Sequence, residues 1–241
     1  MTTNSLFNND KDSRENLWKS PRDRHEGKEI WLLSDLLFFL YRFCGKSLRK
    51  LVIKILWRLE GSGLYSLTLR RIASVYHKVD VGMYTRGPLK NPWNFNPNTK
   101  IGRYCSIFAN AVSFGANHPM NTRSTHALFY NPVLGYSPKD ILTRTHLTIG
   151  NDVFIGSNAI ITSSCSSIGD GAVIGVGTVV SQDIPPYAVV VGNPGRVVRY
   201  RFSNDTIQQL LNSKWWDKSL DELLPEFESF RQPLEGEERI R

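Results

Sequence analysis

A six-residue repeat is the feature that most narrows the folds open to this chain of 241 residues. From Ile149 the sequence reads IGNDVF, IGSNAI and ITSSCS, then one extra residue, then IGDGAV, IGVGTV and VSQDIP. Earlier copies read FNPNTK, IGRYCS and IFANAV from Phe95, and a weaker copy begins at Val81. A period of six fits neither an α-helix nor a long strand, so it indicates short strands separated by tight corners.

Two marks recur in the same phase along the repeat. An aliphatic residue opens each unit, and a small residue follows four positions later, at Cys105, Ala111, Val153, Ala159, Cys165, Ala172 and Thr178. The residue before the small one is often of a type that tolerates a positive φ, which predicts corners at Asn110, Asp152, Asn158, Gly171, Gly177 and Asp183. Three sides of six make a triangular coil of about 18 residues. Ile161 to Ile168 is one residue too long and predicts a local bulge.

These repeats resemble the hexapeptide-repeat acyltransferases, and within them the xenobiotic and polysaccharide O-acetyltransferases. The sequences NHPM from Asn117 and VGNPGRVVR from Val191, and a predicted helix containing Lys214, Trp215 and Trp216, strengthen the resemblance, which covers roughly residues 81–230. It implies a mainly β fold, a left-handed parallel β-helix with an N-terminal helical segment, a long excursion loop and C-terminal helices. That coil is an exception to the usual right-handed crossover.

Composition divides the chain into four segments. Residues 1–29 are polar and predict a flexible tail, and residues 30–78 predict a basic amphipathic helical segment. The β-helix is expected over residues 79–201, with a catalytic loop at 113–146. Residues 202–241 predict a C-terminal helical segment, with Ser203 as an N-cap and a capping box between Ser219 and Glu222.

The six-residue rhythm stops for more than 30 residues between Val112 and Leu147, and an excursion of this length usually has a function. It opens with His118, whose imidazole suits proton transfer near neutral pH. The resemblance implies that His118 is a general base, which deprotonates an acceptor hydroxyl as that hydroxyl attacks acetyl-CoA directly. A loop histidine that only binds a carbonyl is the alternative. Weaker candidates for contact with the substrate are Asn117, Arg123, Tyr130 and Asn131.

A metal site is not expected. His118, His126 and His146 share the loop without a close pair, and metal ligands need convergent spacing. The cysteines Cys44, Cys105 and Cys165 are odd in number and form neither a disulfide framework nor a CxxC pair. A reducing compartment is therefore expected.

The resemblance also implies where the acyl donor binds. In this family acetyl-CoA lies between parallel coils of adjacent subunits, which requires a homotrimer. The positions that carry over are Ser157, Val176, Ser181, Gln182, Arg196 and Arg199. Gln182 stands where lysine is common, and the two arginines suit phosphate. Ordinary repeat positions and solvated arginines are the alternative interpretation of this set.

The formal net charge of +8 is concentrated in one place. Residues 36–78 hold nine basic residues and one acidic residue, so the rest of the chain is balanced and a nucleic-acid partner is not expected. Within the segment, Lys46, Lys50, Lys54 and Arg58 recur at i+4 beside an apolar face of Leu48, Leu51, Val52, Ile55 and Leu59. Two interpretations stay open: binding to an anionic membrane surface, or capping of the open end of the β-helix.

Location and activity follow as expectations. The N-terminus lacks the apolar region of a signal peptide and residues 30–43 are too short to span a bilayer, so the protein is expected in the cytoplasm, either free or at the inner membrane face. The expected activity is acetyl-CoA-dependent O-acetylation of a sugar hydroxyl on a surface polysaccharide or its lipid-linked precursor. The open alternatives are a xenobiotic (antibiotic) acetyltransferase, an amino-sugar N-acetyltransferase and a catalytically silent scaffold.

Overall fold

The computed structural model describes residues 27–234 and 238–239. The predicted flexible tail of residues 1–29 therefore lies outside the described residues, apart from its last three. Among the described residues, no helix combines the length and the apolar character needed to cross a membrane.

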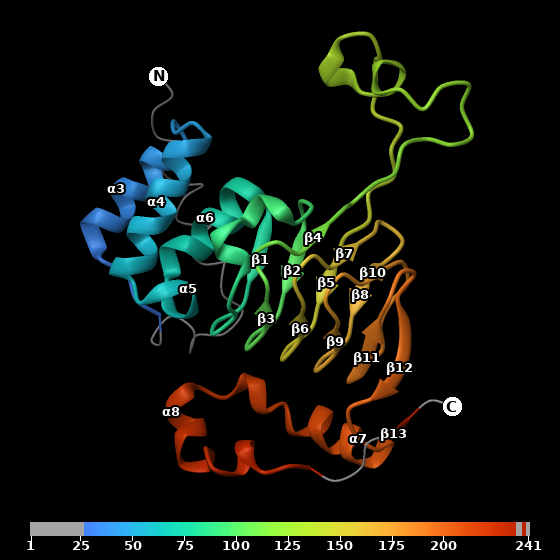
Figure 1. Cartoon of the computed structure of the whole chain (residues 1–241). Coiled ribbons are helices and arrows are strands. Elements are labelled where there is room, and N and C mark those ends of the chain that lie inside the picture. The colour runs from blue at the N-terminus through green and yellow to red at the C-terminus, as the bar shows by residue number, and fades with distance from the viewer. Residues whose placement is uncertain (1–26, 235–237, 240–241) are drawn as a thin grey trace.

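The repeat forms a left-handed parallel β-helix with three sheets, as the family resemblance implies (Figure 1). One sheet contains β1 (Val79–Val81), β2 (Thr99–Ile101), β5 (Thr148–Ile149) and β8 (Ser167–Ile168). A second contains β4 (Val112–Ser113), β7 (Ile160–Ile161) and β10 (Val179–Val180). The third contains β3 (Ser106–Ile107), β6 (Phe154–Ile155), β9 (Val173–Ile174) and β11 (Ala188–Val191), and ends with the antiparallel β12 (Arg196–Tyr200) and β13 (Glu238–Arg239).

Each side of the coil contributes an aliphatic side chain to a narrow interior. The buried residues that open the units are Ile101, Ile107, Ile149, Ile155, Ile161, Ile168 and Ile174. The small residues four positions later are buried as well, as Cys105 and Ala172 illustrate. At the corners the coils stack backbone on backbone. A Cβ on Gly82 would lie 2.7 Å from the carbonyl carbon of Gly102, so a side chain at this corner would push the coils apart.

The corner residues follow the prediction at four positions and depart from it at two. Asp152, Asn158, Gly171 and Gly177 have positive φ, whereas Asn110 and Asp183 do not, so those two predictions were wrong. The carboxylate of Asp183 instead accepts hydrogen bonds from the backbone N–H groups of Ser166 (2.6 Å) and Ser167 (3.0 Å). These amides belong to the over-long unit. Its extra residue lies in the corner between β7 and β8, and β8 still pairs in register with β5.

Four helices cover the first end of the coil: α3 (Trp31–Tyr41), α4 (Lys46–Leu59), α5 (Ser62–Tyr65) and α6 (Leu67–His77) (Figure 1). Val52, Ile53 and Leu56 of α4 are buried in the same apolar core as the coil residues. The predicted apolar face was therefore only partly right. Leu48, Leu51 and Leu59 are exposed, because the face that α4 turns to its neighbours is centred on Val52, Ile53 and Leu56.

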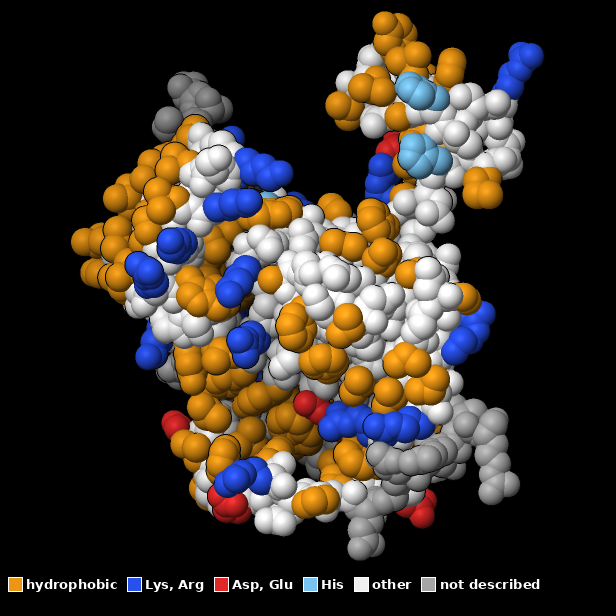
Figure 2. All heavy atoms as spheres, viewed as in Figure 1, with side chains coloured by type: hydrophobic (Ala, Val, Ile, Leu, Met, Phe, Trp, Pro, Cys, Tyr) orange, Lys and Arg blue, Asp and Glu red, His pale blue; other side chains and the backbone are white. Residues whose placement is uncertain are grey.

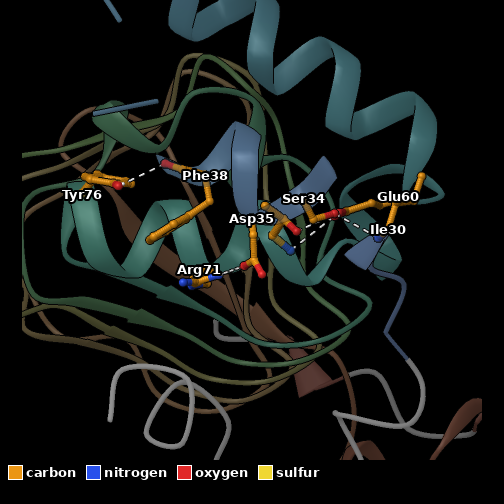
Figure 3. Close-up of polar contacts among 8 residues, drawn as sticks. Ile30, Ser34, Asp35, Phe38, Glu60, Arg71 and Tyr76 are labelled. Carbon is orange, nitrogen blue, oxygen red and sulfur yellow. Dashed lines mark hydrogen bonds and ion pairs between the residues drawn. The ribbon is translucent and has the colours of Figure 1, made fainter. Parts of the chain in front are cut away.

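Polar contacts fix α3 against α4 and α6 (Figure 3). Ser34 of α3 donates a hydrogen bond to Oε1 of the fully buried Glu60 (2.5 Å), and Asp35 forms an ion pair with Arg71 of α6 (2.8 Å). The Tyr76 hydroxyl donates to the carbonyl of Phe38 (3.1 Å). The inner face of α3 is thus held at two consecutive turns.

The C-terminal segment begins with α7 (Asn204–Ser213), which Ser203 caps, and continues to α8 (Leu220–Leu223), where Ser219 and Glu222 form the predicted capping box. The predicted helix around Trp215 is a single 3₁₀ turn, because Lys214 ends α7 in the left-handed conformation. Short 3₁₀ turns occupy Pro88–Lys90, Pro92–Asn94, Ala127–Phe129, Pro132–Leu134, Trp215–Asp217, Leu224–Glu226 and Ser229–Arg231.

Candidate functional site

The excursion loop is an arm that leaves the coil after β4 and returns at β5 (Figure 1). Its base is tied to the body, since the Thr145 N–H donates to the Gly115 carbonyl (2.8 Å) and Asn96 Nδ2 donates to the Thr145 carbonyl (3.1 Å). Beyond that base the arm projects away from the sheets, and it carries His118, His126 and Tyr130.

His118 is oriented by two groups of its own arm. Its Nδ1 lies 2.7 Å from the Thr125 carbonyl oxygen and 2.8 Å from the Tyr130 hydroxyl. A carbonyl oxygen can only accept a hydrogen bond, so Nδ1 carries the proton in the neutral ring. The lone pair of the neutral imidazole is then on Nε2, which makes no hydrogen bond to a described residue. Nε2 is the nitrogen able to take a proton from a ligand.

Tyr130 fixes the plane of the imidazole. The tyrosine is 5% exposed although it belongs to the arm, and its ring meets that of His118 edge to face at 90°, with 5.7 Å between centroids. The sequence suggested Tyr130 only as a weak substrate contact, and the structure places it against the His118 imidazole. The second support is the Thr125 carbonyl. A backbone acceptor can belong to any residue type, so no sequence signal could have identified it.

The other polar candidates of the arm fall into two groups. Asn131 is a turn residue whose Oδ1 accepts a hydrogen bond from the Val133 N–H (3.0 Å), and His126 acts likewise on the Leu128 N–H (3.2 Å). Asn117 and Arg123 are exposed near His118 in sequence.

The described residues bring together no group of three or more His, Cys, Asp or Glu side chains that could hold a metal ion. Cys105 and Cys165 lie inside the coil, where burial raises the pKa of the thiols to about 12 and about 11. Thiols with such pKa values stay protonated at neutral pH and serve as small core residues.

The residues expected to bind the acyl donor lie on two edges of one sheet, the sheet of β4, β7 and β10. Ser157 and Val176 occupy adjacent coils at the corner before this sheet, where the Gly177 N–H donates to the Ser157 carbonyl (2.9 Å). Ser181 and Gln182 follow β10 at the corner after the sheet, and the arm leaves from this same edge after β4. A single chain therefore does not gather the four positions into one pocket.

Arg196 and Arg199 lie on β12, the antiparallel strand that closes the third sheet. Arg196 is exposed and donates to the carbonyl of its neighbour Gly195 (2.9 Å), and Arg199 donates to the carbonyl of Tyr200 (3.3 Å). The strand β12 lies at the far end of the β-helix from α3 (Figure 1).

The curated proteins most similar in sequence to this chain include several acetyltransferases. No family model matches the chain. It is 41% identical over 127 residues to a chloramphenicol acetyltransferase of Agrobacterium fabrum, which is 48% of this chain and 58% of that protein. It is 34% identical over 139 residues to a probable macrolide acetyltransferase of Lysinibacillus sphaericus, which is 53% of this chain and 74% of that protein.

The chain spans only about three fifths of the curated chloramphenicol acetyltransferases that it matches. Among solved structures, it resembles a hexapeptide-repeat-containing acetyltransferase from Vibrio cholerae with a TM-score of 0.38 and 18% identity, over 76% of this chain and 94% of that one.

Proposed function

This chain belongs to the hexapeptide-repeat acetyltransferases, and from that premise we propose that it transfers the acetyl group of acetyl-CoA to an acceptor hydroxyl, with His118 as the general base. The observation that supports the role of His118 is the pairing of Nδ1 with the Thr125 carbonyl, which leaves Nε2 as the basic nitrogen. A loop histidine that only binds a carbonyl is the alternative, and the His118→Ala variant described below separates the two roles.

The proposed reaction needs one base and no covalent acyl-enzyme. Nε2 of His118 takes the proton of the acceptor hydroxyl as its oxygen attacks the thioester carbonyl carbon. The tetrahedral intermediate collapses with breakage of the C–S bond, and the imidazolium returns the proton to the sulfur of CoA. Throughout, the Thr125 carbonyl accepts the Nδ1–H and stabilises the transient positive charge.

For the donor we propose contacts with Ser157, Val176, Ser181, Gln182, Arg196 and Arg199, contributed by two copies of the chain. Ser157 and Val176 lie on one edge of the sheet of β4, β7 and β10, and Ser181 and Gln182 lie on the other. One copy would therefore supply the arm edge and a neighbour the opposite edge. The arm also exposes Phe129, Val133 and Tyr136, apolar and aromatic side chains that a second copy would cover. A homotrimer is the assembly we propose for this arrangement.

For the acceptor we propose a sugar hydroxyl of a surface polysaccharide or of its lipid-linked precursor. A second candidate, an antibiotic hydroxyl, is favoured by the identity of the chain to chloramphenicol and macrolide acetyltransferases. Asn117 and Arg123 are the exposed arm side chains proposed to contact either acceptor.

The test is thioester cleavage by the purified full-length protein with acetyl-CoA and a panel of acceptors: chloramphenicol, a macrolide and sugars linked to undecaprenyl diphosphate. With an acceptor that supports turnover, His118→Ala is expected to lower kcat/KM by about 10²–10⁴-fold, the usual contribution of a general base. His126→Ala removes a second arm histidine and is the matched control, expected to keep wild-type turnover. Equal activity of His118→Ala and wild type would reject the assignment.

A further inference from the structure

We propose that α3 and α4 together form a docking surface for an anionic lipid bilayer. Two sets of side chains define it. The apolar stripe consists of Leu32, Leu36, Phe39 and Phe43, and the basic ridge consists of Lys46, Lys50, Lys54 and Arg58. Figure 2 shows apolar side chains gathered over α3 at the outer edge of the N-terminal helices, with Lys and Arg side chains beside them over α4.

The apolar stripe is one continuous face of a helix that the protein leaves uncovered. Its residues follow one another by four, three and four positions, which places them in line along α3 and its C-terminal extension. All four are exposed, Leu32 to 78% and Phe43 to 69%, and Trp31 at the start of the helix is 76% exposed. Contiguous exposed apolar surface of this kind is typical of an interaction site.

The opposite face of α3 is already occupied, which fixes the direction in which the stripe points. Phe38 and Tyr41 are buried, and the Arg71 guanidinium lies 3.7 Å from the centroid of the Phe38 ring while it pairs with Asp35 (Figure 3). Rotation of the helix to bury the stripe would break these contacts. The stripe is therefore held outward by the fold.

The charge next to the stripe selects the partner. All four residues of the basic ridge are exposed, and like charges at i+4 disfavour a helix unless an anion compensates. The two acidic residues within 30–60 do not offset the ridge, because Asp35 pairs with Arg71 and Glu60 is buried among hydroxyl groups. If a second copy bound through the same surface, the two basic ridges would face and repel each other. Anionic phospholipid headgroups instead attract the basic ridge.

The dimensions favour a helix that lies along the membrane plane. With 11 residues, α3 is roughly 16 Å long, about half of a hydrocarbon core of about 30 Å. An interfacial helix places its aliphatic and aromatic side chains below the headgroups and its lysines at their level, and tryptophan prefers this boundary. Trp31, the stripe and the ridge supply these three elements.

The test is flotation of the full-length protein with two kinds of vesicle, pure phosphatidylcholine and phosphatidylcholine containing phosphatidylglycerol. Wild type is expected to float with the anionic vesicles at low salt, and much less with neutral vesicles or at high salt. The variants Leu36→Gln/Phe39→Gln and Lys46→Gln/Lys50→Gln/Lys54→Gln should each lower the bound fraction at least fivefold. The matched control is Leu224→Gln/Phe227→Gln, because these two apolar residues are exposed to the same extent (53% and 54%) on the C-terminal segment.

Each result decides the proposal. Wild-type binding by both surface variants, or equal binding to neutral vesicles, would overturn it. So would a change of oligomeric state in the Leu36→Gln/Phe39→Gln variant, measured by light scattering without vesicles, because the stripe would then cover another copy. Unchanged thioester cleavage by the surface variants shows that they are folded, and the outcome does not depend on His118 being the base.

Discussion

The tautomer of His118 depends on the Thr125 carbonyl, and the plane of its ring depends on Tyr130. These two supports have different strengths. The carbonyl fixes which nitrogen carries the proton, whereas the tyrosine shares that proton and packs against the ring edge. Loss of the Tyr130 hydroxyl alone should therefore leave the tautomer unchanged.

We expect Tyr130→Phe to lower kcat only about two- to tenfold, since one hydrogen bond contributes about 0.5–1.5 kcal/mol. Tyr130→Ala also removes the ring that orients the imidazole and should cost more than Tyr130→Phe. The pH profile of kcat/KM identifies the mechanism, because a group that contacts the base shifts the acidic limb of that profile. Tyr136→Phe, on an exposed tyrosine of the same arm, is the control. If Tyr130→Phe were as inactive as His118→Ala, the tyrosine would have a role in proton transfer itself.

His118, Tyr130 and Thr125 show how much of the candidate site the sequence predicts. The NHPM context and the interrupted repeat single out His118. Tyr130 carries no mark of its role, because its burial against the histidine results from the fold of the arm. The contact of His118 with the Thr125 carbonyl can be identified only from coordinates. The same is true of the division of the proposed donor residues between two sheet edges, and a site built from both edges also needs a second chain.

At the scale of elements, Glu60 joins the N-terminal helices into one unit. Its carboxylate accepts hydrogen bonds from the hydroxyls of Ser34 and Ser66, and from Thr68 through both Oγ1 (2.6 Å) and the backbone N–H (3.3 Å). Because the carboxylate is fully buried, these hydrogen bonds offset the cost of removing it from water.

Glu60→Gln is the variant that tests this unit. An amide has one acceptor oxygen in place of two, so its NH₂ group would face at least one N–H or O–H donor. We expect the free energy of unfolding in urea to fall by about 1–3 kcal/mol, the cost of unsatisfied buried polar groups. Glu228→Gln, which weakens an exposed ion pair with Arg231, should change it by less than 0.5 kcal/mol, roughly the value of a surface pair. Equal effects of the two variants would contradict the role of Glu60.

The period of six predicted the elements of the coil better than their corners. The aliphatic residue of each unit is buried as expected, because only that phase fills the interior. The prediction of a positive φ was wrong at Asp183, because its carboxylate accepts a hydrogen bond from the Ser166 N–H in the over-long unit of the neighbouring coil. A residue type that tolerates positive φ can also be selected as a hydrogen-bond acceptor, and the sequence alone does not separate the two reasons.

At the scale of the whole molecule, the basic segment divides into two populations. Arg70 is buried and donates to the carbonyls of Ser66 (2.8 Å) and Gly82 (3.0 Å), so it ties α6 to the coil, and Arg71 pairs with Asp35. On α4, Arg49 is half-buried, whereas Lys46, Lys50, Lys54 and Arg58 are exposed. The sequence located the excess charge correctly, but part of it joins the helices to the β-helix and only the rest is available to a partner.

The contact between α6 and α3 should be sensitive to acid. The His77 ring, at the end of α6, lies 2.7 Å from the Tyr41 hydroxyl through Nε2, and partial burial, with Arg49 nearby, lowers the pKa of His77 from 6.5 to about 4. The unfolded chain therefore binds this proton more readily than the folded chain between pH 6.5 and 4. The stabilisation is present above pH 6.5 and is lost as the pH falls through this window.

Thermal unfolding of wild type and His77→Gln from pH 8 to pH 5 measures this loss. Glutamine can accept the Tyr41 hydrogen bond but cannot bind a proton. We expect wild type to lose about 1 kcal/mol of stability between pH 7 and pH 5, a value reduced for the partial exposure of the ring, and the variant to lose less. The histidines of the arm are the same in both proteins, so the comparison isolates the contribution of His77. Parallel curves for the two proteins would show that protonation of His77 does not weaken the contact between α6 and α3.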